Sequence, residues 1–296
     1  VISEIGGVGE TVSLINQKGD KYLDLFKGTT TISILSLLAW GLGYCGQPHI
    51  LVRFMAIDKP SDLAKARNIG ITWMIFTVGG ALLVGLVGIA YMLKFDQTTM
   101  NIFDSSKTES ETIFIYFSRI LFHPLIGGFL LSAILAAVMS TISSQLLVTS
   151  SSLTEDIYKA FIKKDASPKQ LLRASRLSVL IVAVIAVLLS LTPKDSILNL
   201  VGNAWAGFGA AFGPLIVFSL FWKKTTWQGA LSGMLVGGAV VLAWVYIAHP
   251  YKDWYEMIPG FFSSAIVIYV VSLITQKPNK EIDKEFDEVV SILKEN

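Results

Sequence analysis

Two short stretches of the chain hold residues whose types and spacing suit the binding of small solutes. The first is Trp40-Gly41-Leu42-Gly43-Tyr44-Cys45-Gly46-Gln47-Pro48, where an apolar run meets three glycines and a proline. Glycine and proline weaken helical hydrogen bonding more than any other residues. Trp40 and Tyr44 are four positions apart, so they present two aromatic rings on one helical face. Aromatic rings beside freed backbone groups predict a site for a small solute.

The second stretch offers neutral oxygen atoms. Ala137, Ser140 and Thr141 fall on one face of a helix, so the carbonyl of the first and the hydroxyls of the other two can converge. Hydroxyl and carbonyl oxygens suit a hard alkali cation such as sodium. The alternative remains open that these hydroxyls bond back to a carbonyl one turn earlier, or hold neighbouring helices together.

The composition is that of a membrane protein. Apolar residues make up 53% of the chain and charged residues 16%, against about 25% in soluble domains. A formal charge of +2 is too small to indicate a nucleic-acid partner. The single cysteine, Cys45, excludes an internal disulfide and a cysteine-based zinc site. No nucleophile, base and orienting group can be assembled from the inventory, so we do not expect an enzyme.

Seven apolar runs are each about long enough to cross a hydrocarbon core of roughly 30 Å. They cover residues 31–54, 71–93, 125–150, 177–191, 197–222, 228–248 and 258–276. The sequence therefore predicts an all-α membrane protein with about seven transmembrane helices, the first of them broken near Gly46. Freed backbone at membrane depth is tolerated only where it is buried in protein or lines a watery cavity. A proline-kinked helix packed against its neighbours is the alternative interpretation of this break.

The connections between the runs give an orientation and one clear helix start. When successive connections are placed on alternate sides of the membrane, sixteen of the 24 lysines and arginines fall on one side. The positive-inside rule then predicts a cytoplasmic tail and an external amino-terminal segment. Ser167-Pro168-Lys169-Gln170 has the form of a capping box with proline at the first helical position. The runs carry no acidic residue in their interiors, so this portion shows no proton relay.

Taken together, these stretches resemble the sodium/solute symporter family, in its bacterial proline-transporting branch. The segments that carry the resemblance are residues 40–50, 131–141, 154–161 and 204–214, and the resemblance extends over residues 29–276. It implies a LeuT-like core of two inverted five-helix repeats within thirteen spans. The chain would then comprise an extracytoplasmic loop, the second repeat, two peripheral transmembrane helices and a cytoplasmic tail, at residues 1–28, 29–224, 225–276 and 277–296.

The resemblance also implies roles for particular residues. Sodium ligands of the family fall on Ala137, Ser140 and Thr141, and proline contacts fall on Trp40, Tyr44 and Pro48. The remaining ligands come from a helix of the first repeat, which this sequence lacks. The chain, which has no initiator methionine, is therefore expected to be a fragment that holds half of a binding site and does not transport alone.

The expected function is sodium-coupled symport of L-proline across the cytoplasmic membrane by alternating access. Sodium is the coupling ion, and no organic cofactor is needed. Sodium binding would stabilise the outward-open state, with a coupling free energy to the solute of about 1–3 kcal/mol. Two alternatives stay open. One is the same machine with another small solute as its substrate, and the other is a membrane sensor that binds a solute without transporting it.

Overall fold

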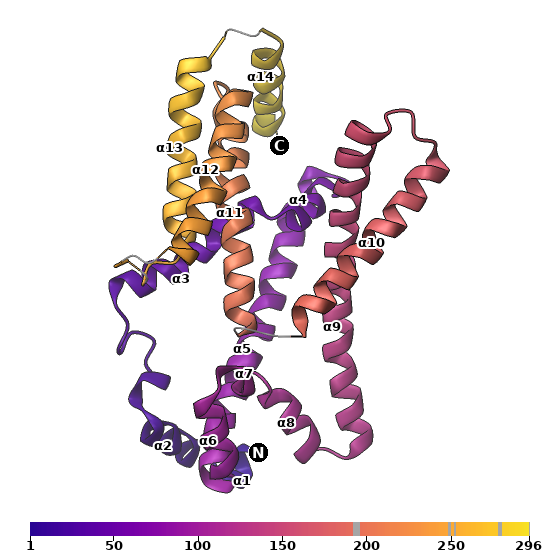
Figure 1. Ribbon diagram of the computed structural model, residues 1–296. Helices are drawn as coiled ribbons and strands as arrows, with labels where there is room; N and C mark the ends of the chain where they lie inside the picture. The colour runs from indigo at the N-terminus through magenta and orange to yellow at the C-terminus, as the bar shows by residue number, and fades with distance from the viewer. Residues whose placement is uncertain (192–195, 248–249, 252, 278–279, 296) are drawn as a thin grey trace. The chain divides into compact units, whose positions relative to one another are not determined.

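The computed structural model describes residues 1–191, 196–247, 250–251, 253–277 and 280–295, and all regular structure in these ranges is helical (Figure 1). Six segments are long and apolar enough to cross a membrane, and a shorter apolar segment spans Thr31–Gly46. The predicted all-α membrane fold is confirmed. The long helices are α5 (Leu63–Phe95), α9 (Pro124–Ser151), α10 (Pro168–Ser190), α11 (Ile197–Phe221), α12 (Trp227–Tyr246) and α13 (Met257–Thr275).

Most helix ends coincide with the ends of the predicted apolar runs, but some do not. Helix α5 begins eight residues before the run predicted at 71–93, because Lys65 and Arg67 are good helix formers in water as well. Helix α12 ends at Tyr246, and Ala248, the predicted end of that run, lies outside the described residues. Apolarity thus marks the membrane-embedded part of a helix rather than the whole helix.

The chain divides into two compact units. The first contains Val1–Asp24 and Thr72–Ser196, and the second contains Leu25–Ile71 and Ile197–Asn296. Each unit is described separately below.

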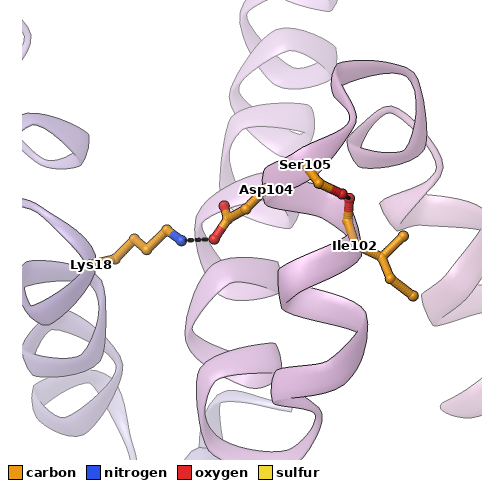
Figure 2. A network of polar contacts seen from close by, with 4 residues as sticks. All are labelled: Lys18, Ile102, Asp104 and Ser105. Atoms are coloured by element: carbon orange, nitrogen blue, oxygen red, sulfur yellow. Dashed lines mark hydrogen bonds and ion pairs between the residues drawn. The ribbon is translucent and has the colours of Figure 1, made fainter.

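In the first unit, short amino-terminal helices pack on the end of α5. Helices α1 (Ile2–Ile5) and α2 (Val8–Lys18) bury Ile5 and Ile15 against Ala90 of α5. Lys18 forms a salt bridge with Asp104 on α6 (Gln97–Ser105), beside the internal bond from the Ser105 hydroxyl to the Ile102 carbonyl (Figure 2). These contacts fasten the amino-terminal segment to the α5–α6 region.

A polar cluster forms where α5 gives way to α6. The Asp96 carboxylate caps α6 by accepting from the Thr99 backbone N–H over 3.0 Å. It also accepts from the Thr99 hydroxyl over 2.6 Å and from the Tyr116 hydroxyl over 2.7 Å. Tyr116 lies on α8 (Ile113–Ile120), and α7 (Lys107–Ser110) precedes it. These hydrogen bonds, led by those of Thr99, hold the pKa of Asp96 below its ordinary value.

Helices α9 and α10 form an antiparallel hairpin in the same unit (Figure 1). Helix α9 continues into a π-helix, η4 (Ser152–Ile162), before the chain turns. Helix α10 then begins with the predicted capping box, in which the side chains of Ser167 and Gln170 each bond the other's backbone N–H. The expectation of a helix start at Ser167-Pro168 is therefore confirmed.

In the second unit, α11, α12 and α13 lie side by side (Figure 1). Small residues allow this close approach: a Cβ added to Gly233 would lie 2.2 Å from the Ile268 side chain, and one on Gly229 would lie 2.1 Å from the Ser272 hydroxyl. Helix α14 (Lys280–Glu295) follows, and the Lys223 amine lies 3.3 Å from the Asp287 carboxylate.

Helix α11 contains a buried proline. Pro214 has no backbone N–H, so it cannot donate to the carbonyl of Ala210 one turn earlier. That carbonyl faces α12, since a Cβ added to Gly237 would lie 2.4 Å from its oxygen. Glycine at 237 lets α12 cover this part of the helix with backbone alone.

Candidate functional site

The first apolar segment is broken at the predicted place. Helix α3 (Thr31–Gly43) passes into a 3₁₀ turn, η2 (Tyr44–Gly46), and Gln47 then adopts an extended conformation with φ −89° and ψ 111°. Pro48 is the first residue of α4 (Pro48–Met55) and is half-buried. A residue before proline is disfavoured in the helical region, which accounts for the break at Gln47.

Glycines at the break let it press against α11. A Cβ added to Gly46 would lie 2.6 Å from the Phe208 carbonyl oxygen and 2.7 Å from the Gly213 nitrogen. A Cβ on Gly43 would lie 2.0 Å from Nε1 of Trp205. No side chain fits at these two positions, so the glycines are required for packing as well as for the break.

Four aromatic side chains gather around the break, and we call them the aromatic cluster: Trp40, Tyr44, Trp205 and Tyr255. The indole of Trp205 stacks on that of Trp40, with centroids 5.4 Å apart and planes at 16°. It also meets Tyr44 edge-on at 4.8 Å, while Tyr255 stacks on Trp40 at 6.1 Å. The two rings predicted from the sequence are therefore joined by two others that sequence reasoning did not identify.

The cluster is open on the Tyr44 side. Tyr44 is 46% exposed, whereas Trp40, Trp205 and Tyr255 are half-buried. The Tyr255 hydroxyl donates to the Gly202 carbonyl over 2.8 Å, and burial raises the pKa of Tyr255, so the phenol keeps its proton. Tyr44 is therefore the exposed ring of the aromatic cluster.

Two hydrogen bonds tie residue 205 to both sides of the break. The Trp205 indole N–H donates to the Trp40 carbonyl over 3.0 Å, before the break. The Gln47 side-chain amide, only 3% exposed, donates to the Trp205 carbonyl over 3.0 Å, after the break. A polar glutamine between Gly46 and Pro48, within an apolar run, was the available sequence signal for this contact.

The oxygen-bearing face lies on α9. The Thr141 hydroxyl donates to the Ala137 carbonyl over 3.3 Å, so these two oxygens converge as the helical spacing predicts. The hydroxyl of Ser144 likewise donates to the Thr141 carbonyl over 2.9 Å. Ala137, Ser140 and Thr141 are all exposed on this helix. The back-bonded geometry is the one that serine and threonine commonly adopt, so sodium binding here remains a prediction.

The two predicted sets belong to different compact units. The α9 oxygens lie in the first unit, and the aromatic cluster with Pro48 lies in the second. Within the second unit the structure brings the three predicted solute contacts onto one broken segment.

Comparison with known proteins agrees with these features. The sequence profile described as the sodium:solute symporter family matches residues 1–237. The chain is 54% identical to the osmoregulated proline transporter OpuE of Bacillus subtilis and 51% identical to sodium/proline symporter 2 of Staphylococcus saprophyticus. Each alignment covers 99% of the chain. Over 96% of its length the chain is 51% identical to the high-affinity proline transporter PutP of B. subtilis.

The chain spans only part of the length of these relatives. The matched regions cover 58%, 57% and 58% of the three proteins, respectively. The family match nevertheless covers most of the chain, and the apolar helices agree with it. The chain is therefore a multi-pass membrane protein that belongs to the sodium:solute symporter family.

Proposed function

We propose that this chain is part of a sodium-coupled symporter that carries L-proline across the bacterial cytoplasmic membrane by alternating access. The observation that carries the proposal is the helix break, with Trp40, Tyr44 and Pro48 placed along it. Discontinuous helices are where secondary transporters bind their cargo. Relatives that are 54% and 51% identical to this chain over the matched regions are named as proline transporters.

The break offers both parts of a binding site for an amino acid. The exposed ring of Tyr44 is the surface on which the apolar pyrrolidine ring of proline packs, and Trp40 supports it through Trp205. The carboxyl end of α3 carries partial negative charge and the amino end of α4 carries partial positive charge. The substrate ammonium is therefore drawn to the former and its carboxylate to the latter.

For sodium, α9 supplies three of the oxygens. The Ala137 carbonyl and the hydroxyls of Ser140 and Thr141 share one face, and neutral oxygens are suitable ligands for this ion. The Thr141 hydroxyl donates to the Ala137 carbonyl over 3.3 Å, and its two lone pairs are left to accept a cation. Ligands beyond these three would come from a first repeat outside this chain.

The proposal includes an organisation of the chain within the whole transporter. Residues 29–224 form the second five-helix repeat, 225–276 form two peripheral helices, and the segments 1–28 and 277–296 face outside and inside, respectively. Sodium on α9 stabilises the outward-open state, in which the α3–α4 break accepts proline. The two ligands then strengthen each other's binding by the same coupling free energy, about 1–3 kcal/mol.

Uptake by the full-length protein in proteoliposomes tests the proposal. An inward sodium gradient should drive accumulation of radiolabelled L-proline, and an equal potassium gradient should not. Unlabelled L-proline should compete. Proline binding without accumulation under the sodium gradient would instead support a solute sensor. Uptake of another solute, with no competition by proline, would replace the substrate.

A further inference from the structure

Residue 205 of α11 is bonded on both sides of the helix break. Its indole N–H donates to the carbonyl of Trp40, and its own carbonyl accepts from the side chain of Gln47. The two bonds run in opposite directions, each over 3.0 Å. Moving α11 away from the break therefore breaks both bonds together.

The indole also contacts both rings of the predicted substrate site. It stacks on Trp40 with planes at 16° and meets Tyr44 edge-on at 81°. Both are favourable arrangements for aromatic pairs. The orientation of the Tyr44 ring, which is the exposed surface of the cluster, is consequently fixed by a residue that lies 161 positions further along the chain.

The residues packed against Trp205 leave little freedom for its contacts with the broken helix to shift. Gly43 allows the indole to lie against α3, since a Cβ there would come within 2.0 Å of Nε1. Gln47 is 3% exposed and its amide has little water with which to replace the Trp205 carbonyl. Losing a buried polar partner is costly, so the Gln47 bond holds the register of the break against α11.

We propose that Trp205 is a positioning residue of the substrate site, and that with Gln47 it forms a latch that fixes the broken helix and the Tyr44 ring on α11. The latch rests on the proposed function in that the site it organises is the proposed proline site. Trp205 acts through Trp40 and Tyr44. Releasing either bond loosens the break and weakens solute binding.

Cys45 provides a reporter that needs no substrate. It is the single cysteine of the chain, it is half-buried, and it lies inside η2 between Tyr44 and Gly46. Its alkylation by a maleimide should be measured in the full-length protein, with cysteines outside this chain replaced by serine. Loss of one hydrogen bond of the latch should raise the alkylation rate about five-fold.

The variants are chosen to remove one bond each. W205F keeps an aromatic ring and loses the N–H donor, whereas Q47M keeps the length of the side chain and loses the amide. W244F is the matched control, because the Trp244 indole donates to the Trp254 carbonyl over 3.1 Å in the same unit, in a bond that involves neither Trp205 nor Gln47. W205F and Q47M should each speed alkylation of Cys45, and W244F should leave it at the wild-type rate.

Transport kinetics then separate positioning from general loss of structure. W205F and Q47M should raise KM for L-proline about five-fold, with the maximal rate within about two-fold of wild type. Normal Cys45 alkylation and normal KM in folded W205F and Q47M would overturn the latch. Equal effects of W244F would show a general loss of packing and would also overturn it. Since alkylation is measured without solute, absence of proline uptake in the wild type would overturn the proposed function and leave the latch result standing.

Discussion

Gly209 on α11 and Gly43 on α3 lie so close that a Cβ added to the former would come within 2.7 Å of the Cα of the latter. The same added atom would lie 2.4 Å from Cε of Met257 on α13. Three helices of the second unit therefore meet at a point where only hydrogen fits. The broken helix is held on α11 by contact between backbones as well as by the aromatic cluster.

Replacing Gly209 by alanine should consequently destabilise the protein. Overpacking costs about 1–3 kcal/mol, which exceeds the gain of about 1 kcal/mol in helix propensity. The thermal midpoint of the full-length protein in detergent measures the change. G207A is the matched control on the same helix, because an added Cβ there meets nothing within 4 Å among the described residues. Equal midpoints for the two variants would contradict this packing.

Replacing Thr141 by alanine tests the sodium site on α9. The change removes one hydroxyl ligand and keeps the helix, so the sodium concentration for half-maximal proline uptake should rise about ten-fold or more. T141S keeps the hydroxyl and should remain near wild type. S143A is the control, since the Ser143 hydroxyl is also exposed and back-bonded, to Met139 over 2.7 Å, but lies two positions from Thr141 and so projects from nearly the opposite side of the helix. An unchanged sodium dependence in T141A would count against the assignment.

Replacing Tyr44 separates its ring from its hydroxyl. Y44F keeps the exposed ring and its edge contact with Trp205, so KM for L-proline should stay within about two-fold of wild type. Y44A removes the surface on which the substrate packs and should raise KM about ten-fold. Initial uptake rates at saturating sodium provide the comparison. A rise in KM of more than about two-fold in Y44F would show that the substrate contact is made by the hydroxyl instead.

The Asp96 cap predicts a stability that depends on pH. Hydrogen bonds from Thr99 and Tyr116 hold the pKa of Asp96 below its ordinary value of 3.8, so its contribution is complete above that value and is lost as pH falls below it. Burial and the bond to Asp96 raise the pKa of Tyr116 to about 12, so this donor keeps its proton throughout.

The matching substitutions are D96A and D96N. D96A removes the cap and should cost about 1 kcal/mol of stability at neutral pH. D96N keeps a good capping side chain and should lose the added pH dependence, which lies below about pH 4. Thermal melts at neutral pH measure the first effect, and melts from about pH 4 downwards measure the second. An identical acid dependence in D96N and wild type would remove Asp96 as the cause.

Local rules predicted much of this structure. Glycine and proline placed the helix break at Gly46 and Pro48, and the capping box placed the start of α10 at Pro168. Helical periodicity alone brought the Ala137 carbonyl and the Thr141 hydroxyl together. Each of these depends on residues within about one turn of each other, which is the range over which sequence spacing fixes geometry.

The tertiary partners of the break could not be found in this way. The small residues around Trp205 favour close packing, but nothing local says which helix this segment meets. Trp205 contacts Trp40 across 165 positions, and Tyr255 joins them from the segment just before α13. Such contacts are decided by the packing of whole helices, so the second half of the aromatic cluster required the structure.

The proline within α11 sets how this helix can deform. Pro214 makes no hydrogen bond to the carbonyl of Ala210. Bending α11 at that turn therefore breaks one helical hydrogen bond fewer than bending it at another interior turn. Trp205 stands on the stretch before the weak turn, and the contacts with Lys223 stand after it. A change of angle at this turn would therefore move the part of α11 that carries Trp205 relative to the part that ends at Phe221.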